Sequence, residues 1–376
     1  MTIRYRRSPN LVSYWSGKRI VFENYYTLSK VHAAPLLFEF LSFFNTWRNA
    51  RAFALRFPQF DSAVLRSGLS VLVRHGLLQR SDRQNDAVAP RTMNAWANWN
   101  PAAGLLHFST KDLHYLPDLE ILLQRQQARA KTQPMPAPVK RYPNATHIAL
   151  PAPRCTGEFP QVLLARRTWR KFSTDPVELS ALSTLLGLSF GVRWWVEVPQ
   201  LGRLALKTSP SGGARHPIEA YVLARRVANL TPGLYHYASD KHGLERLRRG
   251  ASSRQLVRYL AGQKWYGSAA ALVLMTAVFR RPQWKYQSPR AYRAVLIDAG
   301  HLCQTFCLVA TWLGLAPFCS MALADSRIEA DIGIDGVSES VLYAAGVGTL
   351  PRGVKWAPWP TRFQGTRHPN PSFAQP

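Results

Sequence analysis

The hydrophobic positions of the first 80 residues change from a strand-like period to a helical one. Two short strands are expected around a Ser16-Gly17 turn, at residues 11–15 and 19–22. Three segments with an apolar helical face follow, at residues 36–44, 50–57 and 62–75. Gly76 ends the third helix, and residues 77–79 continue as a β-wing. The pattern predicts a winged-helix-like unit over residues 1–82.

The next 70 residues are less regular and separate two domains. The motif WANWNPAAGLLHFST, at residues 96–110, contains two tryptophans and His107. A Gln- and Arg-rich helix is expected at residues 118–130. It is followed by KTQPMPAPVKRYP, in which four prolines in thirteen residues indicate a linker. Residues 83–155 are therefore predicted to be a connecting segment and Pro-rich linker.

Strand and helix patterns alternate irregularly in the rest of the chain. Helices are expected at residues 176–186, with Gly187 just past the end, 253–261 and 292–315. Strands are expected at residues 218–223, 233–237, 244–247, 269–279, 318–322 and 341–347. The run at 269–279 is continuously apolar, which indicates a central strand covered on both faces. The fold class is predicted to be α+β, a mixed sheet with surrounding helices over residues 156–355, followed by a tail at 356–376.

Charge and cysteine content narrow the setting. The 376 residues carry 48 Lys and Arg against 21 Asp and Glu, a net charge of +27, and 37 of the 48 are Arg. This excess suits a nucleic acid, a membrane surface or an acidic peptide, but it is spread over the whole chain. Four cysteines without paired spacing, no signal peptide and no membrane-length apolar run predict a cytoplasmic protein with reduced thiols. Cys303 and Cys307, four apart near His301, are expected to pack in the core, and no metal site is predicted.

Candidate chemistry centres on a turn of small residues, KTSPSGGARHP at 207–217. Such a turn lets backbone N–H groups approach a planar ligand closely. Upstream lies RRTWRK at 166–171, a cation-rich segment suited to phosphate. Downstream are the Lys285-Tyr286 pair and DAGH at 298–301.

These motifs, in this order from about residue 159 to 350, resemble the SagB-type dehydrogenases of the nitroreductase-like FMN flavoenzymes. SPSGGARHP, GLYHY, KY…YR and DAGH are most similar to the branch described as peptide maturation dehydrogenases. The resemblance implies an FMN cofactor and a homodimer in which the turn contacts the flavin of the partner subunit. It also implies that the N-terminal module recognises a precursor peptide, with a cyclodehydratase or other peptide-modifying enzyme as a further partner. No specific nucleic acid and no membrane are expected.

The resemblance assigns cofactor-binding roles to the arginine-rich segment and the turn. The expected cofactor-binding residues are Arg166, Arg167, Thr168, Arg170, Ser209, Pro210, Ser211 and Gly212, together with Gly346 and Gly348 after the last strand. This G-x-G lacks the strand-turn-helix context of a dinucleotide fingerprint.

Lys285 and Tyr286 match the family's Lys-Tyr pair at the substrate face of the flavin. Oxidation of an azoline to an azole removes a C–H proton as hydride leaves, so a lysine base beside a tyrosine proton donor suits the reaction. Gln287-Ser288-Pro289 departs from the glycine-containing turn that is usual after the pair in this family. The predicted function is FMN-dependent oxidation, azoline to azole, during maturation of a ribosomally synthesised peptide.

Two other functions remain open from sequence: an NAD(P)H-dependent nitroreductase or ene-type reductase, and a DNA-binding regulator with a flavin sensor domain. The third helix of the N-terminal unit offers only Arg66, Arg74 and His75 to DNA. His107 is expected to be a packed histidine with one satisfied nitrogen. Asp298 and His301 receive no acid–base role, and a hydrolase triad of Ser211, His216 and Asp298 is disfavoured because no G-x-S-x-G elbow is present.

Overall fold

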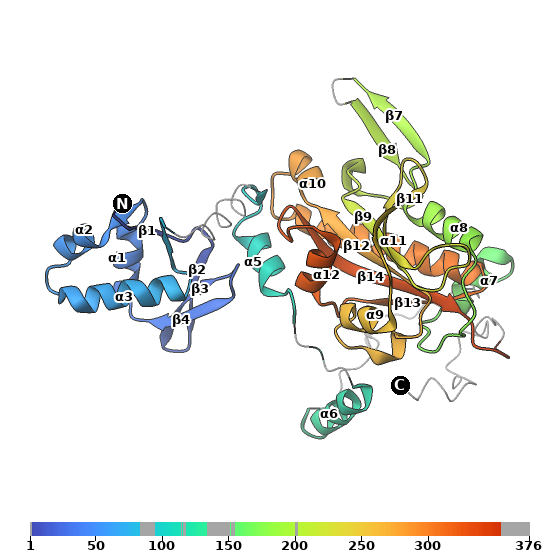
Figure 1. Cartoon of the computed structure of the whole chain (residues 1–376), viewed down its shortest axis with the longest axis horizontal. Helices are drawn as coiled ribbons and strands as arrows, with labels where there is room; N and C mark the ends of the chain where they lie inside the picture. The colour runs from blue at the N-terminus through green and yellow to red at the C-terminus, as the bar shows by residue number, and fades with distance from the viewer. Residues whose placement is uncertain are drawn as a thin grey trace.

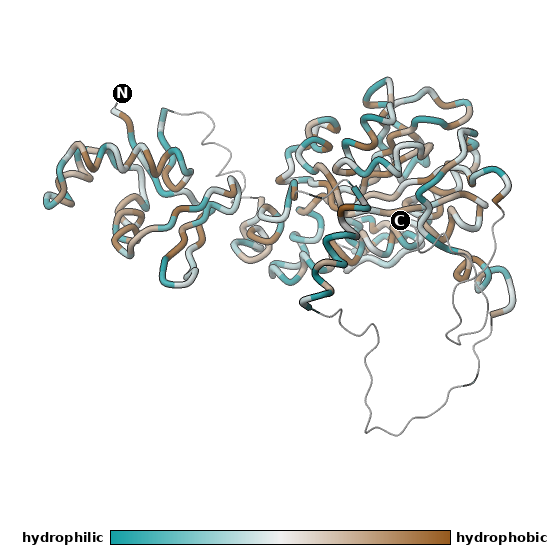
Figure 2. Tube along the Cα trace, turned by 90° about the horizontal axis from the view of Figure 1, so that it is seen from below, coloured by the Kyte–Doolittle hydropathy of each residue, from teal (hydrophilic) through white to brown (hydrophobic). Residues whose placement is uncertain are grey.

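The computed structural model describes residues 2–82, 95–113, 115, 118–133, 151, 155–199 and 202–354. Residues 134–143 of the expected Pro-rich linker and the tail at 356–376 lie outside the described residues, whereas residues 131 and 132 of that linker belong to α6. Figures 1 and 2 both show two bodies side by side, an N-terminal unit and a larger C-terminal domain, with α5 (Ala102–Ser109) between them.

The N-terminal unit combines three helices with two small sheets. The helices are α1 (Leu36–Phe43), α2 (Ala50–Arg56) and α3 (Ser62–Arg74), close to their expected bounds. The sheets have the orders β5-β1-β6 and β2-β3-β4, formed by β1 (Arg4–Arg7), β2 (Leu11–Ser16), β3 (Arg19–Asn24), β4 (Ser29–Ala33), β5 (Arg48–Asn49) and β6 (Leu78–Arg80). Asn49 and Asp61 cap α2 and α3 by accepting hydrogen bonds from backbone N–H groups. The rings of Phe44, Phe53 and Phe57 form the centre of its core.

The strand that was predicted to form a β-wing is β6, and in the part of the chain that the structure describes it does not pair with a hairpin neighbour as a wing strand would. β6 pairs antiparallel with the N-terminal strand β1, with Arg7 opposite Leu78. It therefore closes a sheet with β1 and β5 rather than forming a hairpin within the described residues. The helices and the β2–β3 hairpin of the prediction are present, and the winged-helix classification itself stays a prediction.

The C-terminal domain is built on a six-stranded sheet of order β11-β10-β9-β12-β14-β13. Its strands are β9 (Ile218–Ala224), β10 (Gly233–Ala238), β11 (Gly243–Arg249), β12 (Ala271–Val278), β13 (Leu315–Ser320) and β14 (Glu339–Thr349). All its strand pairs are antiparallel, and the parallel pairing in the described chain is an isolated bridge between Val177 and Val227. The predicted α+β fold class is confirmed. The prediction of a mixed sheet, with both parallel and antiparallel strand pairs, was wrong.

Helices cover both faces of this sheet (Figure 1), as the apolar run in β12 predicts. Val273 and Met275 of β12 face a core shared with α8 (Leu179–Phe190) and α11 (Ala291–Trp312). Leu272 and Leu274 face the opposite core, shared with α9 (Ser253–Tyr259) and α12 (Asp325–Ile332). The alternation of side chains along one strand thus fills two cores. The remaining described helices are α6 (Leu119–Thr132), α7 (Glu158–Ala165), α10 (Arg280–Lys285), η2 (Gly212–Ala214) and η3 (Lys264–Tyr266).

Two helices differ from their sequence-based description. α8 continues through Gly187 to Phe190 and is followed by Gly191. Glycine at position 187 leaves room for His242, because a Cβ there would lie 2.8 Å from the imidazole Cε1. α11 is 22 residues long and, by length and composition alone, apolar enough to cross a membrane, with a mean hydropathy of 1.4. It packs against α8, β13 and β14, so in this fold it serves as a core helix.

A hairpin that the sequence did not predict projects from the domain. β7 (Trp194–Val198) and β8 (Gly202–Leu206) pair antiparallel and extend beyond the sheet at the top of Figure 1. Trp194 is 69 % exposed.

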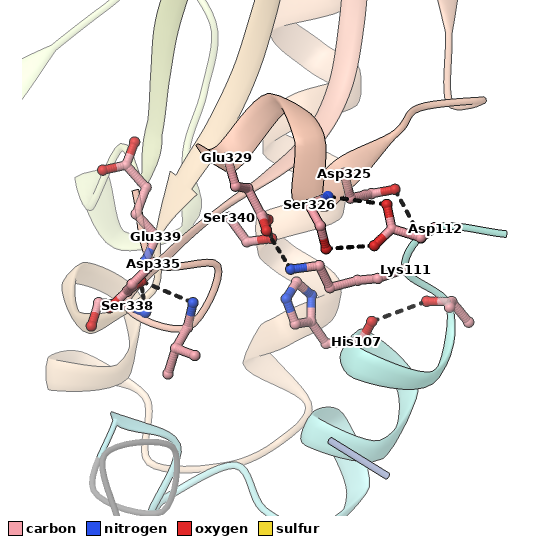
Figure 3. Close-up of polar contacts among 12 residues, drawn as sticks. His107, Lys111, Asp112, Asp325, Ser326, Glu329, Asp335, Ser338, Glu339 and Ser340 are labelled. Carbon is pink, nitrogen blue, oxygen red and sulfur yellow. Dashed lines mark hydrogen bonds and ion pairs between the residues drawn. The ribbon is translucent and has the colours of Figure 1, made fainter. Parts of the chain in front are cut away.

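The connecting segment joins the N-terminal unit to the larger domain. Tyr25 of the N-terminal unit stacks on Phe108 of α5, and the buried His107 imidazole Nδ1 lies 2.8 Å from the Tyr292 hydroxyl of α11. Past the end of α5, Lys111 forms an ion pair with Glu329 of α12 at 2.5 Å, and Asp112 accepts hydrogen bonds from Ser326 (Figure 3). His107 is thus a packed histidine whose Nδ1 is hydrogen-bonded, as predicted.

Candidate functional site

The small-residue turn is fastened to α11 by side-chain hydrogen bonds. Ser211 Oγ donates to Asp298 Oδ2 at 2.5 Å and accepts from the backbone N–H of His216 at 2.9 Å. The Ser209 and Thr305 hydroxyls lie 2.7 Å apart. Asp298 is thereby assigned a positioning role that the sequence did not reveal. Burial raises the pKa of Asp298, while the Ser211 hydroxyl opposes this rise.

This arrangement is not a hydrolase triad. The Ser211 hydroxyl is bonded directly to the Asp298 carboxylate, and His216 contributes its backbone N–H rather than its imidazole. The imidazole is partly buried among cations, and burial followed by the Lys207 charge lowers the pKa of His216 to about 4. The structure therefore gives a physical reason for rejecting the triad.

The turn lies directly against the predicted catalytic pair. Gly213 has φ 62°, and a Cβ added there would lie 2.6 Å from the Tyr286 hydroxyl and 2.7 Å from Lys285 Nζ. Only glycine combines this backbone angle with so close an approach. The structure thus brings Ser211 and Gly212 of the turn together with Lys285 and Tyr286, which come more than 70 residues later in the chain. Lys285 is exposed in the single chain.

Residues of the WANW motif hold the segment that carries the catalytic pair. Trp99 Nε1 donates to the Tyr286 carbonyl at 3.1 Å, and Gln283 of α10 donates to the Ala95 carbonyl at 2.8 Å. Trp96 Nε1 donates to the Val337 carbonyl at 2.9 Å. Both indoles are fully buried. The connecting segment is therefore a structural part of the candidate site.

A cationic cleft of about 670 Å³ opens beside the turn, between the β7–β8 hairpin and α10. Its charged or titratable lining residues are Arg203, Lys207, Arg215, His216, Glu219, His236, Asp240, Arg280 and Arg281. Trp195 and Trp284 add aromatic surface, and the Arg203 and Arg215 guanidinium groups stack on these two rings. The cleft thus combines net positive charge with aromatic contacts.

Buried ionisable groups shape the floor of this cleft. Burial lowers the pKa of Lys207 to about 8. Glu219 forms an ion pair with Arg281 and lies 3.3 Å from His236 Nε2. The Glu219 hydrogen bond, together with that of Glu245, raises the pKa of His236 to about 9, so His236 is cationic at neutral pH. Lys207, Glu219 and His236 were not predicted as site residues, although Lys207 is the first residue of the turn motif.

The arginine-rich segment lies elsewhere in the single chain. The backbone N–H of Trp169 bonds to the Pro317 carbonyl of β13, and the charge of Arg166 acts on Cys307 of α11. The turn is held by Asp298 and Thr305, which lie nine and two residues before Cys307, so a regular helix places both of them on the face opposite Cys307. Arg166, Arg167, Thr168 and Arg170 therefore do not meet Ser209, Pro210, Ser211 and Gly212 within one chain.

Gly346 and Gly348 have an internal structural role. A Cβ at Gly346 would lie 2.1 Å from the Phe318 ring, and one at Gly348 would lie 2.7 Å from the Phe172 ring. The side-chain faces of these glycines are thus filled by phenylalanines of the same chain. Packing accounts for both glycines without a cofactor.

A cluster of three cysteine thiols is a further feature that the sequence did not predict. Cys319 of β13 lies beside Cys303 and Cys307, so that the three sulfurs are all within 4.8 Å of one another. Hydrogen bonds from Cys303 and Cys307 lower the pKa of the Cys319 thiol. The spacing of Cys303 and Cys307 was visible in the sequence, but the pairing of β13 with β14 that brings Cys319 to them was not.

Comparison with known proteins gives the family of this domain. Residues 163–349 match the model described as the nitroreductase family. The putative nitroreductase MJ1384 of Methanocaldococcus jannaschii is 30 % identical over 167 residues, which cover 44 % of this chain and 80 % of that protein. The chain belongs to the nitroreductase family. The family match begins at residue 163, so the N-terminal unit and α5 lie outside it.

Other similar proteins are named for peptide processing. The trifolitoxin-processing protein TfxB of Rhizobium leguminosarum bv. trifolii is 29 % identical over 177 residues, covering 45 % of this chain and 47 % of TfxB. The structure of the E. coli microcin synthetase McbBCD complex with truncated pro-MccB17 bound contains a chain that is 19 % identical, with a TM-score of 0.47. That match covers 70 % of this chain and 94 % of the other. This chain is similar to the trifolitoxin-processing protein over about half of that protein's length.

Proposed function

We propose that this protein is an FMN-dependent oxidoreductase of the SagB type that oxidises azolines to azoles in a ribosomally synthesised peptide. The observation that carries the proposal is the contact of the Gly213 turn with Lys285 and Tyr286. In this proposal Lys285 and Tyr286 act as a proton-transfer pair beside a surface suited to a planar ring. Membership of the nitroreductase family and homology to a trifolitoxin-processing protein support it.

The residues present fit the chemistry of FMN. Arg166 and Arg170 offer guanidinium groups for a phosphate, and the open backbone around Gly212 and Gly213 can approach a flat ring. The Ser211 hydroxyl is already donated to Asp298, so this side chain shapes the turn rather than donating to a flavin. The two donor sets occupy opposite faces of α11, and a second copy of the chain would unite them.

We further propose the homodimer that this division requires. Large apolar side chains remain exposed near both ends of α11: Leu296 and Ile297 near its start, at 43 and 56 %, and Trp312 at its end, at 48 %. Phe159 and Leu163 of the adjacent α7 are 66 and 44 % exposed. Exposed apolar side chains of this kind suit a subunit interface.

When bound, FMN supplies a hydride acceptor. Lys285 then acts as the base that removes the ring C–H proton of the azoline, while the adjacent Tyr286 hydroxyl orients the substrate or relays the proton. Trp99 fixes the backbone of Tyr286 and so holds the pair against the turn. Because Lys285 is exposed in the single chain, its removal from water comes from the bound peptide and the partner subunit.

The cationic cleft and the N-terminal unit provide surfaces for the peptide and for a peptide-modifying partner such as a cyclodehydratase. An acidic precursor peptide matches the cleft's arginines and the chain's net charge of +27. Against a DNA-binding regulator, α3 offers only a small cationic surface: Arg66 and Arg74 are exposed, whereas His75 lies 3.2 Å from the Ser29 hydroxyl.

The second candidate function is NAD(P)H-dependent reduction of small molecules. It is favoured by the 80 % coverage of MJ1384, a protein named a putative nitroreductase. The two functions differ in the direction of electron flow through the same site. They can therefore be separated by asking which substrate reduces the flavin.

The test uses full-length protein reconstituted with FMN and an azoline-containing peptide. We expect yellow protein and loss of two hydrogen atoms per azoline by mass spectrometry. Lys285→Ala should abolish oxidation and keep the flavin, whereas Lys264→Ala, an exposed lysine on η3, should retain both. Failure to bind FMN, or full activity of Lys285→Ala, would overturn the proposal. Rapid flavin reduction by NAD(P)H with nitroaromatic turnover and no peptide oxidation would favour the second function.

A further inference from the structure

The three clustered cysteines form an unusually uniform donor set. Cys303 and Cys307 are four apart on α11, which puts both thiols on one helix face, and Cys319 reaches them from β13. Cys303 and Cys307 are 3 and 5 % exposed, and Cys319 is half-buried. All three are free thiols with sulfurs within 4.8 Å of one another. Two of the cysteines are thus held in the core, and the third, Cys319, is partly exposed.

This spacing is close to that of a trigonal metal–thiolate centre. With metal–sulfur bonds of about 2.3 Å, three thiolates around one ion are about 4 Å apart. The observed separations need only a small inward adjustment of side chains. A hydrophobic packing of three cysteines explains their burial but does not require the sulfurs to converge on one point.

The donor types select the class of ion. Within the described residues no imidazole or carboxylate joins this cluster, and the Tyr343 hydroxyl is hydrogen-bonded to the Cys319 and Cys303 thiols. The donors that suit a soft ion are therefore the three sulfurs. Soft thiolates favour Cu(I) and zinc over hard cations. Structural zinc sites are almost always four-coordinate, whereas Cu(I) is satisfied by three sulfurs. Arg166, whose charge acts on Cys307 and Cys319, would offset part of the negative charge of a copper–thiolate group.

We propose that Cys303, Cys307 and Cys319 bind one Cu(I) ion per chain through three thiolates. Binding releases the thiol protons and involves no electron transfer. Cys319 is the entry position because it is the most accessible of the three sulfurs. Arg166 is also a candidate ligand for the FMN phosphate. A metal ion bound by the three cysteines would therefore act electrostatically on the arginine-rich segment. The copper site itself does not depend on the proposed oxidase activity.

The test is an anaerobic titration of reduced, metal-free, full-length protein with Cu(I) in the presence of a competing Cu(I) chelator. We expect one Cu(I) per chain and an X-ray absorption spectrum with three sulfur neighbours. Cys319→Ser should weaken binding by about a hundredfold or more, because a direct ligand is lost rather than an outer-shell partner. Cys155→Ser is the matched control, because Cys155 lies outside the cluster, and it should bind as the unmodified chain does.

Several results would overturn the site. They are a copper content well below one per chain, a spectrum with two sulfurs or with nitrogen neighbours, equal loss of binding in Cys155→Ser, and binding of Zn²⁺ with rejection of Cu(I). If Cys319→Ser does not fold, the sulfur count from the unmodified protein still decides. Formation of a disulfide in air combined with no anaerobic Cu(I) binding would also contradict the proposal.

Discussion

Gly213 shows how a single residue can be constrained by both backbone and neighbours. Its left-handed φ and the closeness of Lys285 and Tyr286 are independent reasons for glycine. The sequence identified the small-residue turn and the Lys-Tyr pair separately, but nothing in local spacing indicated that one faces the other. The contact forms because β9 and β12 are neighbours in the sheet, which brings the turn before β9 next to α10 after β12.

We predict that Gly213→Ala destabilises the fold more than a matched glycine substitution does. Gly250 also has a left-handed φ, 83°, but an added Cβ there meets nothing within 4 Å. Gly250→Ala should therefore show only the backbone cost, on the order of 1 kcal/mol. Gly213→Ala should add the displacement of Lys285 and Tyr286, and lose substrate oxidation. Urea unfolding curves of both variants measure the difference, and equal destabilisation would show that the contact with the pair is unimportant.

Asp325 illustrates a cost of burial at the junction drawn in Figure 3. Burial raises the pKa of Asp325 to about 6, and the nearby charges of Asp112 and Glu329 add to this. A raised carboxyl pKa means that the folded state holds the proton more tightly than the unfolded state does. The contribution of Asp325 to the free energy of unfolding is therefore largest below its ordinary pKa of 3.8, and it is lost as the pH rises through about 6.

We predict that Asp325→Asn removes this fall. At pH 4 the variant and the unmodified protein should differ little, because the carboxyl is largely protonated. At pH 7 the variant should be more stable, by on the order of 2 kcal/mol, since it carries no buried charge. The amide oxygen can still accept the Asp112 N–H bond. Chemical denaturation at several pH values checks this, and a stability difference that does not change with pH would contradict it.

At the scale of elements, the sequence predicted most of the C-terminal strands and long helices because their apolar periods are clear. It missed β7–β8 and the short helices α7, α10 and α12. The residues of β7–β8 and α10 are largely exposed or aromatic and carry no regular period. It misplaced the end of α8, because Gly187 is a usual helix stop and its contact with His242 is a tertiary effect. The role of the WANW motif was equally invisible, since its partners Tyr286 and Val337 are about 190 and 240 residues away.

We predict that the two buried tryptophans of this motif are separable. Trp96→Phe and Trp99→Phe each lose one indole N–H bond to a backbone carbonyl, so both should lose about 1 kcal/mol or slightly more of stability. Only Trp99→Phe frees the Tyr286 backbone, so it should also lower the turnover rate, with flavin content retained. Denaturation and steady-state kinetics of the pair test this. Equal turnover in the two variants would leave Trp99 with a purely structural role.

At the scale of the whole molecule, two predicted halves of one cofactor site lie on opposite faces of α11. The sequence supplied both halves through motif resemblance, but spacing along a chain cannot show whether they meet within it. The single chain does not join them, and its exposed residues on α7 and α11 offer a surface for a second copy. A chain that begins at residue 151 would lack Trp96 and Trp99 as well as the N-terminal unit. Peptide binding by that unit is therefore better tested with surface substitutions.

The last prediction concerns complementation between two inactive chains. One chain carries Arg166→Ala with Arg170→Ala, and the other carries Gly213→Ala. If each FMN site takes its arginines from one chain and its turn from the other, neither variant alone forms an intact site. A mixed dimer has one site with both defects and one with neither, so an equal mixture after subunit exchange should regain about a quarter of the normal sites. Bound FMN and peptide oxidation measure the recovery. Each variant is first checked for folding by circular dichroism, and a control mixture of either variant with itself should recover nothing. Because a site formed within one chain cannot be rescued by mixing, absence of recovery in a verified mixed dimer would refute the shared site.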